Sequence, residues 1–161
     1  MHIARAIGEV VETPPFDVGR PWASLLDATA EHGDVVVSLL TLVVVDDLMR
    51  LTGILRVRGR DDVRVVAVPS LEVTLPDGTA LRLVDARVQP HGRVSWVSWT
   101  FERPDVIPAR IDARIERIEL EHRIGGSTRM AVTGPWELSS PARPPGPVDD
   151  TVHPTGHTRR T

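Results

Sequence analysis

LEVTLPDGTALRLVDARV (residues 71–88) opens the stretch that decides the fold, and RVSWVSWTFERPDVIP (93–108), ARIDARIERIELE (109–121) and GPWELSSP (134–141) complete it. Apolar and polar residues alternate over short runs in each segment, and proline, glycine and aspartate lie between the runs. This pattern is typical of antiparallel strands joined by tight turns. It predicts a mainly β fold, which we interpret as an immunoglobulin-like antiparallel β-sandwich.

Successive side chains of a strand point to opposite faces of its sheet. Val97, Trp99 and Phe101 therefore share one face, which we place in the core. Trp96 then lies on the outer face. Residues 76–78 (Pro-Asp-Gly) predict a hairpin turn with glycine at the position of positive φ.

Residues 109–124 fit two structures. Ile111, Ile115, Ile118 and His122 have helical spacing. The same segment fits a strand if a β-bulge near residues 116–117 changes the parity of the buried positions. We favour the bulged strand, because the segments on both sides of it resemble hairpins.

The N-terminal part is expected to be helical in one place. In residues 21–32, Pro21 suits a first helical turn, Leu25 and Leu26 share a side, and Gly33 suits the C-terminal cap. The chain then divides into an N-terminal segment (1–33) whose short helix packs on the sandwich, the sandwich domain (34–140), and a proline-rich tail (141–161). Because the tail is almost free of apolar residues, we expect it to be disordered.

Residues 35–45 (VVVSLLTLVVV) prefer a strand, but both of its faces are apolar. Strict alternation places one set of residues together (Val35, Val37, Leu39, Val43, Val45) and a second set opposite (Val36, Leu40, Leu42, Val44). The sandwich core covers one face. The helix or a second copy of the protein must cover the other, since exposed aliphatic side chains promote aggregation. Residues 48–57 follow as a second strand with a bend at Gly53.

Composition limits the classes of function. The chain of 161 residues carries a net charge of -3, which argues against nucleic-acid binding. It contains no cysteine and no lysine, so thiolate and Schiff-base chemistry are excluded. The longest apolar run has 11 residues, too few for a membrane span, and the N-terminus has no secretory pattern. We expect a cytoplasmic protein with no membrane partner and no cofactor.

No catalytic motif is present: GxSxG, HExxH, P-loop and GxGxxG patterns are all absent. We therefore expect no enzyme and assign no catalytic residue. A scattered site built from Asp46, Asp47, His91 and Glu102 is the alternative. The pairs 46–47 and 61–62 are read as turn formers, and no metal site is expected, because Pro154 and Gly156 interrupt the pair His153 and His157.

The same stretch also resembles known proteins. The matching positions are Asp77, Gly78 and Thr79, then Trp99 and Phe101, then Pro104 and Pro108, then Pro135 and Trp136. The pattern resembles uncharacterised actinobacterial β-sandwich proteins and, more distantly, is similar to immunoglobulin-like domains of bacterial anti-sigma-factor-type proteins. The resemblance implies a sandwich and carries over no catalytic residue.

The leading functional hypothesis is a non-enzymatic protein-interaction or structural module that binds a protein partner or itself as a homodimer. The alternative is a sandwich that binds a small ligand or a carbohydrate through Trp96 and nearby arginines. The candidate binding residues are Trp96, Arg56, Arg58, Val36, Leu40, Leu42 and Val44.

Overall fold

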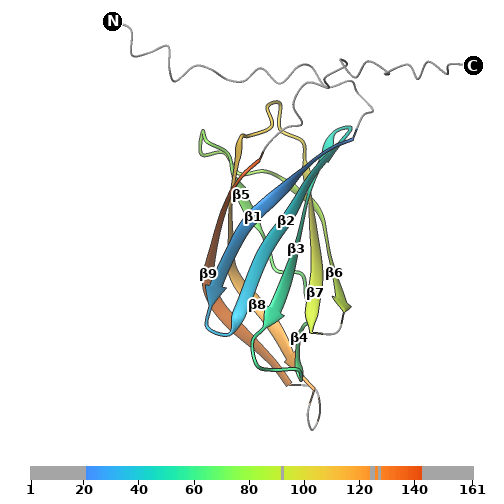
Figure 1. The fold of residues 1–161 in the computed structure, drawn as a ribbon, viewed down its shortest axis with the longest axis vertical. Coiled ribbons are helices and arrows are strands. Elements are labelled where there is room, and N and C mark those ends of the chain that lie inside the picture. The colour runs from blue at the N-terminus through green and yellow to red at the C-terminus, as the bar shows by residue number, and fades with distance from the viewer. Residues whose placement is uncertain (1–20, 92, 124–125, 127, 143–161) are drawn as a thin grey trace, which may run out of the picture.

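The computed structural model describes residues 21–91, 93–123, 126 and 128–142 (Figure 1). Their strands are β1 (Trp22–His32), β2 (Val35–Val45), β3 (Leu48–Val57), β4 (Val63–Val65), β5 (Glu72–Thr74), β6 (Leu83–His91), β7 (Val94–Glu102), β8 (Arg110–His122) and β9 (Thr128–Pro141). The described residues contain no helix, so the predicted mainly β fold is confirmed. The expectations for residues 1–20 and for the tail from 143 onward lie outside the described residues.

The strands form two antiparallel sheets. Sheet A has the order β1-β2-β3-β7-β6. In sheet B, β8 pairs with β9 along one side and with the short strands β4 and β5 along the other. The edges β1 and β9 lie side by side (Figure 1), where the Asp27 N–H donates to the Ser140 hydroxyl at 2.9 Å. The two sheets enclose one apolar core.

Two tryptophans anchor the core. Trp99 of β7 and Trp136 of β9 are fully buried. A buried indole needs a partner for its N–H. Trp99 donates to the Pro69 carbonyl at 2.8 Å, and Trp136 donates to the Val35 carbonyl at 3.0 Å. The predicted inward face of β7 is confirmed, and the second bond ties sheet B to sheet A.

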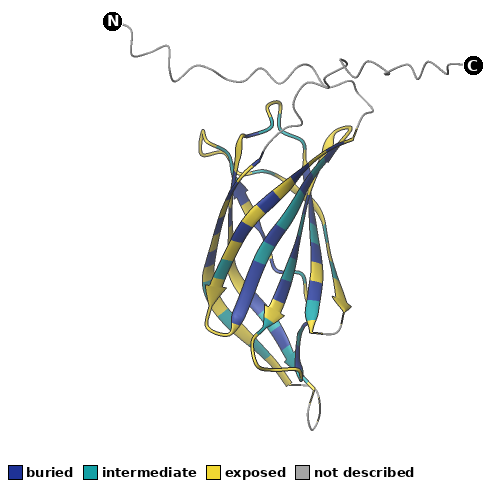
Figure 2. Ribbon diagram, viewed as in Figure 1, coloured by how far each residue is buried: buried dark blue, intermediate teal, exposed yellow. Residues whose placement is uncertain are grey.

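The helix predicted for residues 21–32 is wrong, because these residues form β1. Burial alternates strictly along its first eight positions, as Figure 2 shows. Leu26 is 7% exposed and Leu25 is 83% exposed, although a helix would place them on one side. Gly33 has φ +58°, as expected of a left-handed position, but it closes the β1–β2 hairpin rather than a helix.

Strand β2 spans the predicted residues, but its predicted faces are wrong beyond Leu40. The pairing with β3 shifts by one residue between Leu39 and Thr41, which is a β-bulge. The bulge reverses the alternation, so Leu42 and Val44 are buried in the core. Val43 and Val45 lie on the outer face instead.

Gly53 allows the bulge to form. It lies on β3 opposite Leu39 and is buried. A Cβ atom built on Gly53 would lie 2.6 Å from the Ser38 carbonyl oxygen of β2. The glycine predicted to mark a bend therefore permits a close approach of two backbones.

The ambiguous segment 109–124 forms a strand with a bulge, as favoured. Strand β8 changes register between Ile115 and Arg117, and Ile118 is buried beyond the change. The predicted start of the tail at residue 141 is wrong. Pro141 belongs to β9, and Ala142 is buried and donates to the Ala109 carbonyl at 2.8 Å.

The predicted turn at residues 76–78 is confirmed. Gly78 has φ +87°, and its N–H donates to the Leu75 carbonyl at 2.8 Å. The Asp77 carboxylate accepts the Thr79 N–H at 2.8 Å, and this bond lowers the pKa of Asp77. The turn is thus held by both backbone and side chain.

We expect Gly53→Ala to lower the free energy of unfolding by about 1–3 kcal/mol, the usual cost of overpacking. The added methyl group collides with a carbonyl that the β2 ladder holds in place. Urea unfolding measures the effect. Gly33→Asn is the control, because Asn tolerates positive φ and nothing lies within 4 Å of the added atom. Equal midpoints for Gly53→Ala and the wild type would contradict this role of Gly53.

Candidate binding surface

The outer face of sheet A carries the largest group of exposed apolar side chains on the two sheets. Leu25 of β1 is 83% exposed and Trp96 of β7 is 47% exposed. Ile54 of β3 is paired with Trp96 and is half-buried. We call Leu25, Ile54 and Trp96 the Trp96 surface.

Hydroxyl side chains fill the space between these three residues. Leu25 is paired with Thr41, whose hydroxyl binds that of Thr52 on β3, and Thr52 is paired with Ser98 on β7. These hydroxyls continue the face from β1 to β7 without a charged group. The mutual hydrogen bond of Thr41 and Thr52 lowers the cost of removing these two hydroxyls from water.

The four candidate residues of β2 do not lie together on one surface. Val36 lies on the outer face but is only 2% exposed, between Glu31 and Arg56 in the ladder. Leu40 is half-buried at the bulge. Leu42 and Val44 are core residues, so the prediction that they share a surface with Val36 and Leu40 is wrong.

Arg56 and Arg58 lie at one end of this face, where β3 ends. Arg58 pairs with Glu31 of β1. Arg56 is exposed and makes no ion pair with any described residue. At the opposite end, Asp47 lies in the β2–β3 turn and likewise has no ion pair among the described residues. Arg56 and Asp47 are thus charges without an ion pair among the described residues, and they lie at opposite ends of the face.

A groove of about 420 Å³ lies near the Asp47 end of the face. Its lining residues are Val43, Val45, Leu48, Arg50, Thr52 and Thr100. The Arg50 Nε donates to the Thr100 hydroxyl at 3.3 Å, and Thr100 is 5% exposed. Arg50 also makes no ion pair with a described residue. This Arg50 groove combines aliphatic walls with a guanidinium group that is available to a ligand.

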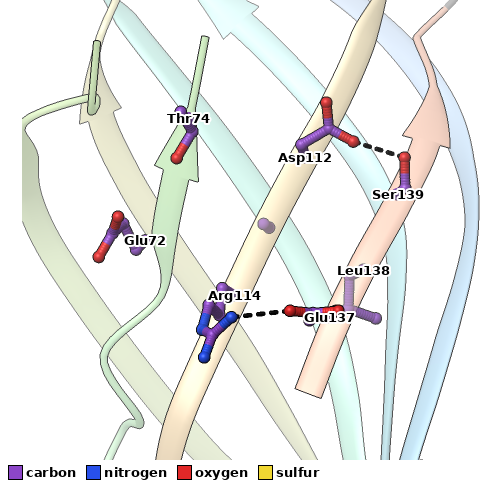
Figure 3. A pocket seen from close by; sticks show the side chains of 8 residues that line it. Glu72, Thr74, Asp112, Arg114, Glu137, Leu138 and Ser139 are labelled. Carbon is purple, nitrogen blue, oxygen red and sulfur yellow. Dashed lines mark hydrogen bonds and ion pairs between the residues drawn. The ribbon is translucent and has the colours of Figure 1, made fainter. Parts of the chain in front are cut away.

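The outer face of sheet B has the opposite character. A depression of about 340 Å³ crosses it, lined by Glu72, Thr74, Asp112, Ala113, Arg114, Glu137, Leu138 and Ser139. Arg114 points toward Glu137, which it binds at 2.7 Å, and Asp112 toward Ser139 (Figure 3). The hydrogen bond to Glu116 raises the pKa of Arg114. These charges satisfy one another in water, so each exposed pair contributes little to stability.

The residues of the alternative scattered site do not converge. Asp46 and Asp47 lie in the β2–β3 turn, near Glu102 at the end of β7. His91 is paired with Val94 at the other end of that strand, about 26 Å away at 3.3 Å per residue. His91 cannot exchange a proton directly with these carboxylates.

The two carboxylates at residues 61–62 bind different partners, and Asp62 also lies 3.9 Å from the Arg60 guanidinium. Asp61 pairs with Arg93 at 3.0 Å, and Asp62 pairs with His122. The two carboxylates thus do not meet at one ion. In the part of the chain that the structure describes, no group of three or more His, Asp or Glu side chains is placed to hold a metal ion.

Sequence reasoning missed Leu25 and Ile54 of the Trp96 surface and Arg50 of the groove. The helix predicted for residues 21–32 places Leu25 on one side together with Leu26. Residues 22–29 (WASLLDAT) do not alternate apolar and polar side chains, so their sequence gives no clear signal for a strand; the period-two alternation of burial is visible only in the structure.

Comparison with protein-family models, with curated proteins and with solved structures finds no match to this chain. None of the described segments is a helix long and apolar enough to cross a membrane. The function must therefore be inferred from the two faces themselves.

Trp96 is expected to dominate the solvent-accessible tryptophan emission. The other three tryptophans, Trp22, Trp99 and Trp136, are at most 4% exposed. In dilute solution, acrylamide should quench one component of the fluorescence, and Trp96→Phe should remove that component. Unchanged quenching in the variant would place Trp96 in the interior and contradict the described surface.

Proposed function

We propose that this protein is a non-enzymatic interaction module and that the Trp96 surface binds a second copy of the chain. The observation that carries the proposal is the contrast between the faces. Sheet B exposes charges that pair with one another, whereas sheet A exposes Leu25 of β1 and Trp96 of β7 on one face, with β2 and β3 between them. Aromatic side chains are enriched in protein interfaces, where they dominate the binding energy.

Charge supports a second copy as the partner. A two-fold axis that crosses the strands reverses their direction. It places the Arg56 end of one copy over the Asp47 end of the other, so two unpaired charges of each copy find partners. An axis parallel to the strands would instead stack like charges. Complementary charges of this kind fix the register of an interface.

The carbohydrate alternative has less support. It calls for a pocket beside the indole, and Trp96 does not line the Arg50 groove or the depression on sheet B. The immunoglobulin-like classification and the cytoplasmic location remain predictions, and no proposed contact depends on them.

The apolar part of the interface can be tested by substitution. Leu25→Arg and Trp96→Arg should each weaken the dimer at least about tenfold, the cost of losing roughly 1.4 kcal/mol. Val106→Arg is the matched control, because Val106 is 59% exposed and lies in the loop between β7 and β8. Sedimentation velocity over a concentration series measures the dissociation constants. A monomeric wild type, or equal effects of all three substitutions, would contradict the proposal.

The charge register can be tested by exchange. Arg56→Asp and Asp47→Arg should each weaken the dimer by about fivefold, as expected for roughly 1 kcal/mol of surface ion pairing. The double variant restores opposite charges and should recover most of the affinity at low salt. If the double variant is weaker than either single variant, the proposed orientation is wrong.

A further inference from the structure

Positions along the proposed interface can be numbered by the outward-facing residues of β3. These residues follow one another at steps of about 6.6 Å, twice the rise of one strand residue, in the order Leu48, Arg50, Thr52, Ile54 and Arg56. Together with the residues that pair with it on the neighbouring strands, each of them forms a row that runs across sheet A. Trp96 belongs to the Ile54 row, and Thr100 belongs to the Arg50 row.

The charge register determines which rows meet. If Arg56 of one copy lies over Leu48 and the neighbouring Asp47 of the other, the two-fold axis crosses β3 at Thr52. The Ile54 row lies one step from Thr52 on one side, and the Arg50 row lies one step away on the other. The axis therefore brings the row of Trp96 over the row of Arg50.

We propose that the Trp96 side chain of each copy occupies the Arg50 groove of the other copy. This inference rests on the proposed function, because it takes the dimer and its orientation as given. The occupant is defined by chemistry: an indole that stands 47% exposed on one surface and a groove of about 420 Å³ on the facing one.

The groove suits an indole in two ways. Val43, Val45 and Leu48 supply aliphatic walls, and the last two are 40% and 36% exposed, so they gain burial when a ring covers them. Arg50 supplies a guanidinium group, which stacks on aromatic faces. Its hydrogen bond to Thr100 holds the side chain near the sheet, so that its plane can receive the ring.

A symmetric contact of this kind occurs twice in the dimer. Each copy contributes one indole and one groove, so the loss of either component removes both contacts. The inference explains why Arg50 makes no ion pair with a described residue while Arg58 on the same face does. A carboxylate partner would compete with the ring for the guanidinium group.

The test combines affinity with fluorescence in the full chain. Arg50→Gln removes the stacking cation, and we expect it to weaken the dimer about fivefold. Trp96→Phe should weaken it by a similar factor, and the double variant should be little weaker than either single variant, because the two side chains act on each other. Arg117→Gln is the matched control: Arg117 is exposed on β8 of sheet B, away from the proposed interface, and pairs with Glu119.

Acrylamide quenching provides a second reading. Trp96 should be quenched in dilute monomer and protected at concentrations where sedimentation shows a dimer. If Arg50→Gln and Trp96→Phe have additive effects, the inference is overturned and the proposed dimer stands without it. A dimer that forms with Trp96 still quenched overturns both the inference and the proposed Trp96 interface. A chain that stays monomeric at every concentration overturns both.

Discussion

The one-residue bulge of β2 at Leu40, opposite Gly53, is the constraint on which the rest of the structure depends. Strand β2 has apolar residues at almost every position, so either set of alternate positions could face the core. The bulge settles this by reversing the alternation: Val35, Val37 and Leu39 enter the core before it, and Leu42 and Val44 enter after it. Val43 and Val45 are thereby turned to the outer face, where they wall the Arg50 groove. The surface that we assign to binding is a consequence of this local backbone feature.

Part of the fold follows from the sequence because it is encoded locally. The parity of Val97, Trp99 and Phe101 is a strict two-residue repeat, and the glycine of the turn at 76–78 needs positive φ. The bulge of β8 could also be predicted, since Ile115 and Ile118 are separated by three positions rather than two. In each case a few neighbouring residues suffice to specify the structure.

The sequence-based predictions failed where contacts between distant parts of the chain determine the local structure. Residues 22–29 form a strand because they pair with β2, although a helix accommodates their composition equally well. The bulge of β2 left no trace in its own sequence, since every register of an apolar run looks alike; its signal was Gly53 on the neighbouring strand. Among the candidate binding residues, Trp96 and the two arginines lie at the surface, as predicted. The prediction misplaces Leu42 and Val44 because it lacks the bulge. It omits Leu25 because it assigns β1 to a helix.

The outer faces of the two sheets differ in the free energy of removing them from water. The charges of sheet B are satisfied by one another and by solvent, so covering them would cost desolvation. The outer face of sheet A exposes aliphatic and aromatic carbon, and covering it is favourable. Hydroxyl-radical footprinting at rising protein concentration tests this distinction most directly. The account predicts that protection of Leu25 and Trp96 increases with concentration while the reactivity of Val106 stays constant. If the reactivity of all three residues is independent of concentration, the account is contradicted.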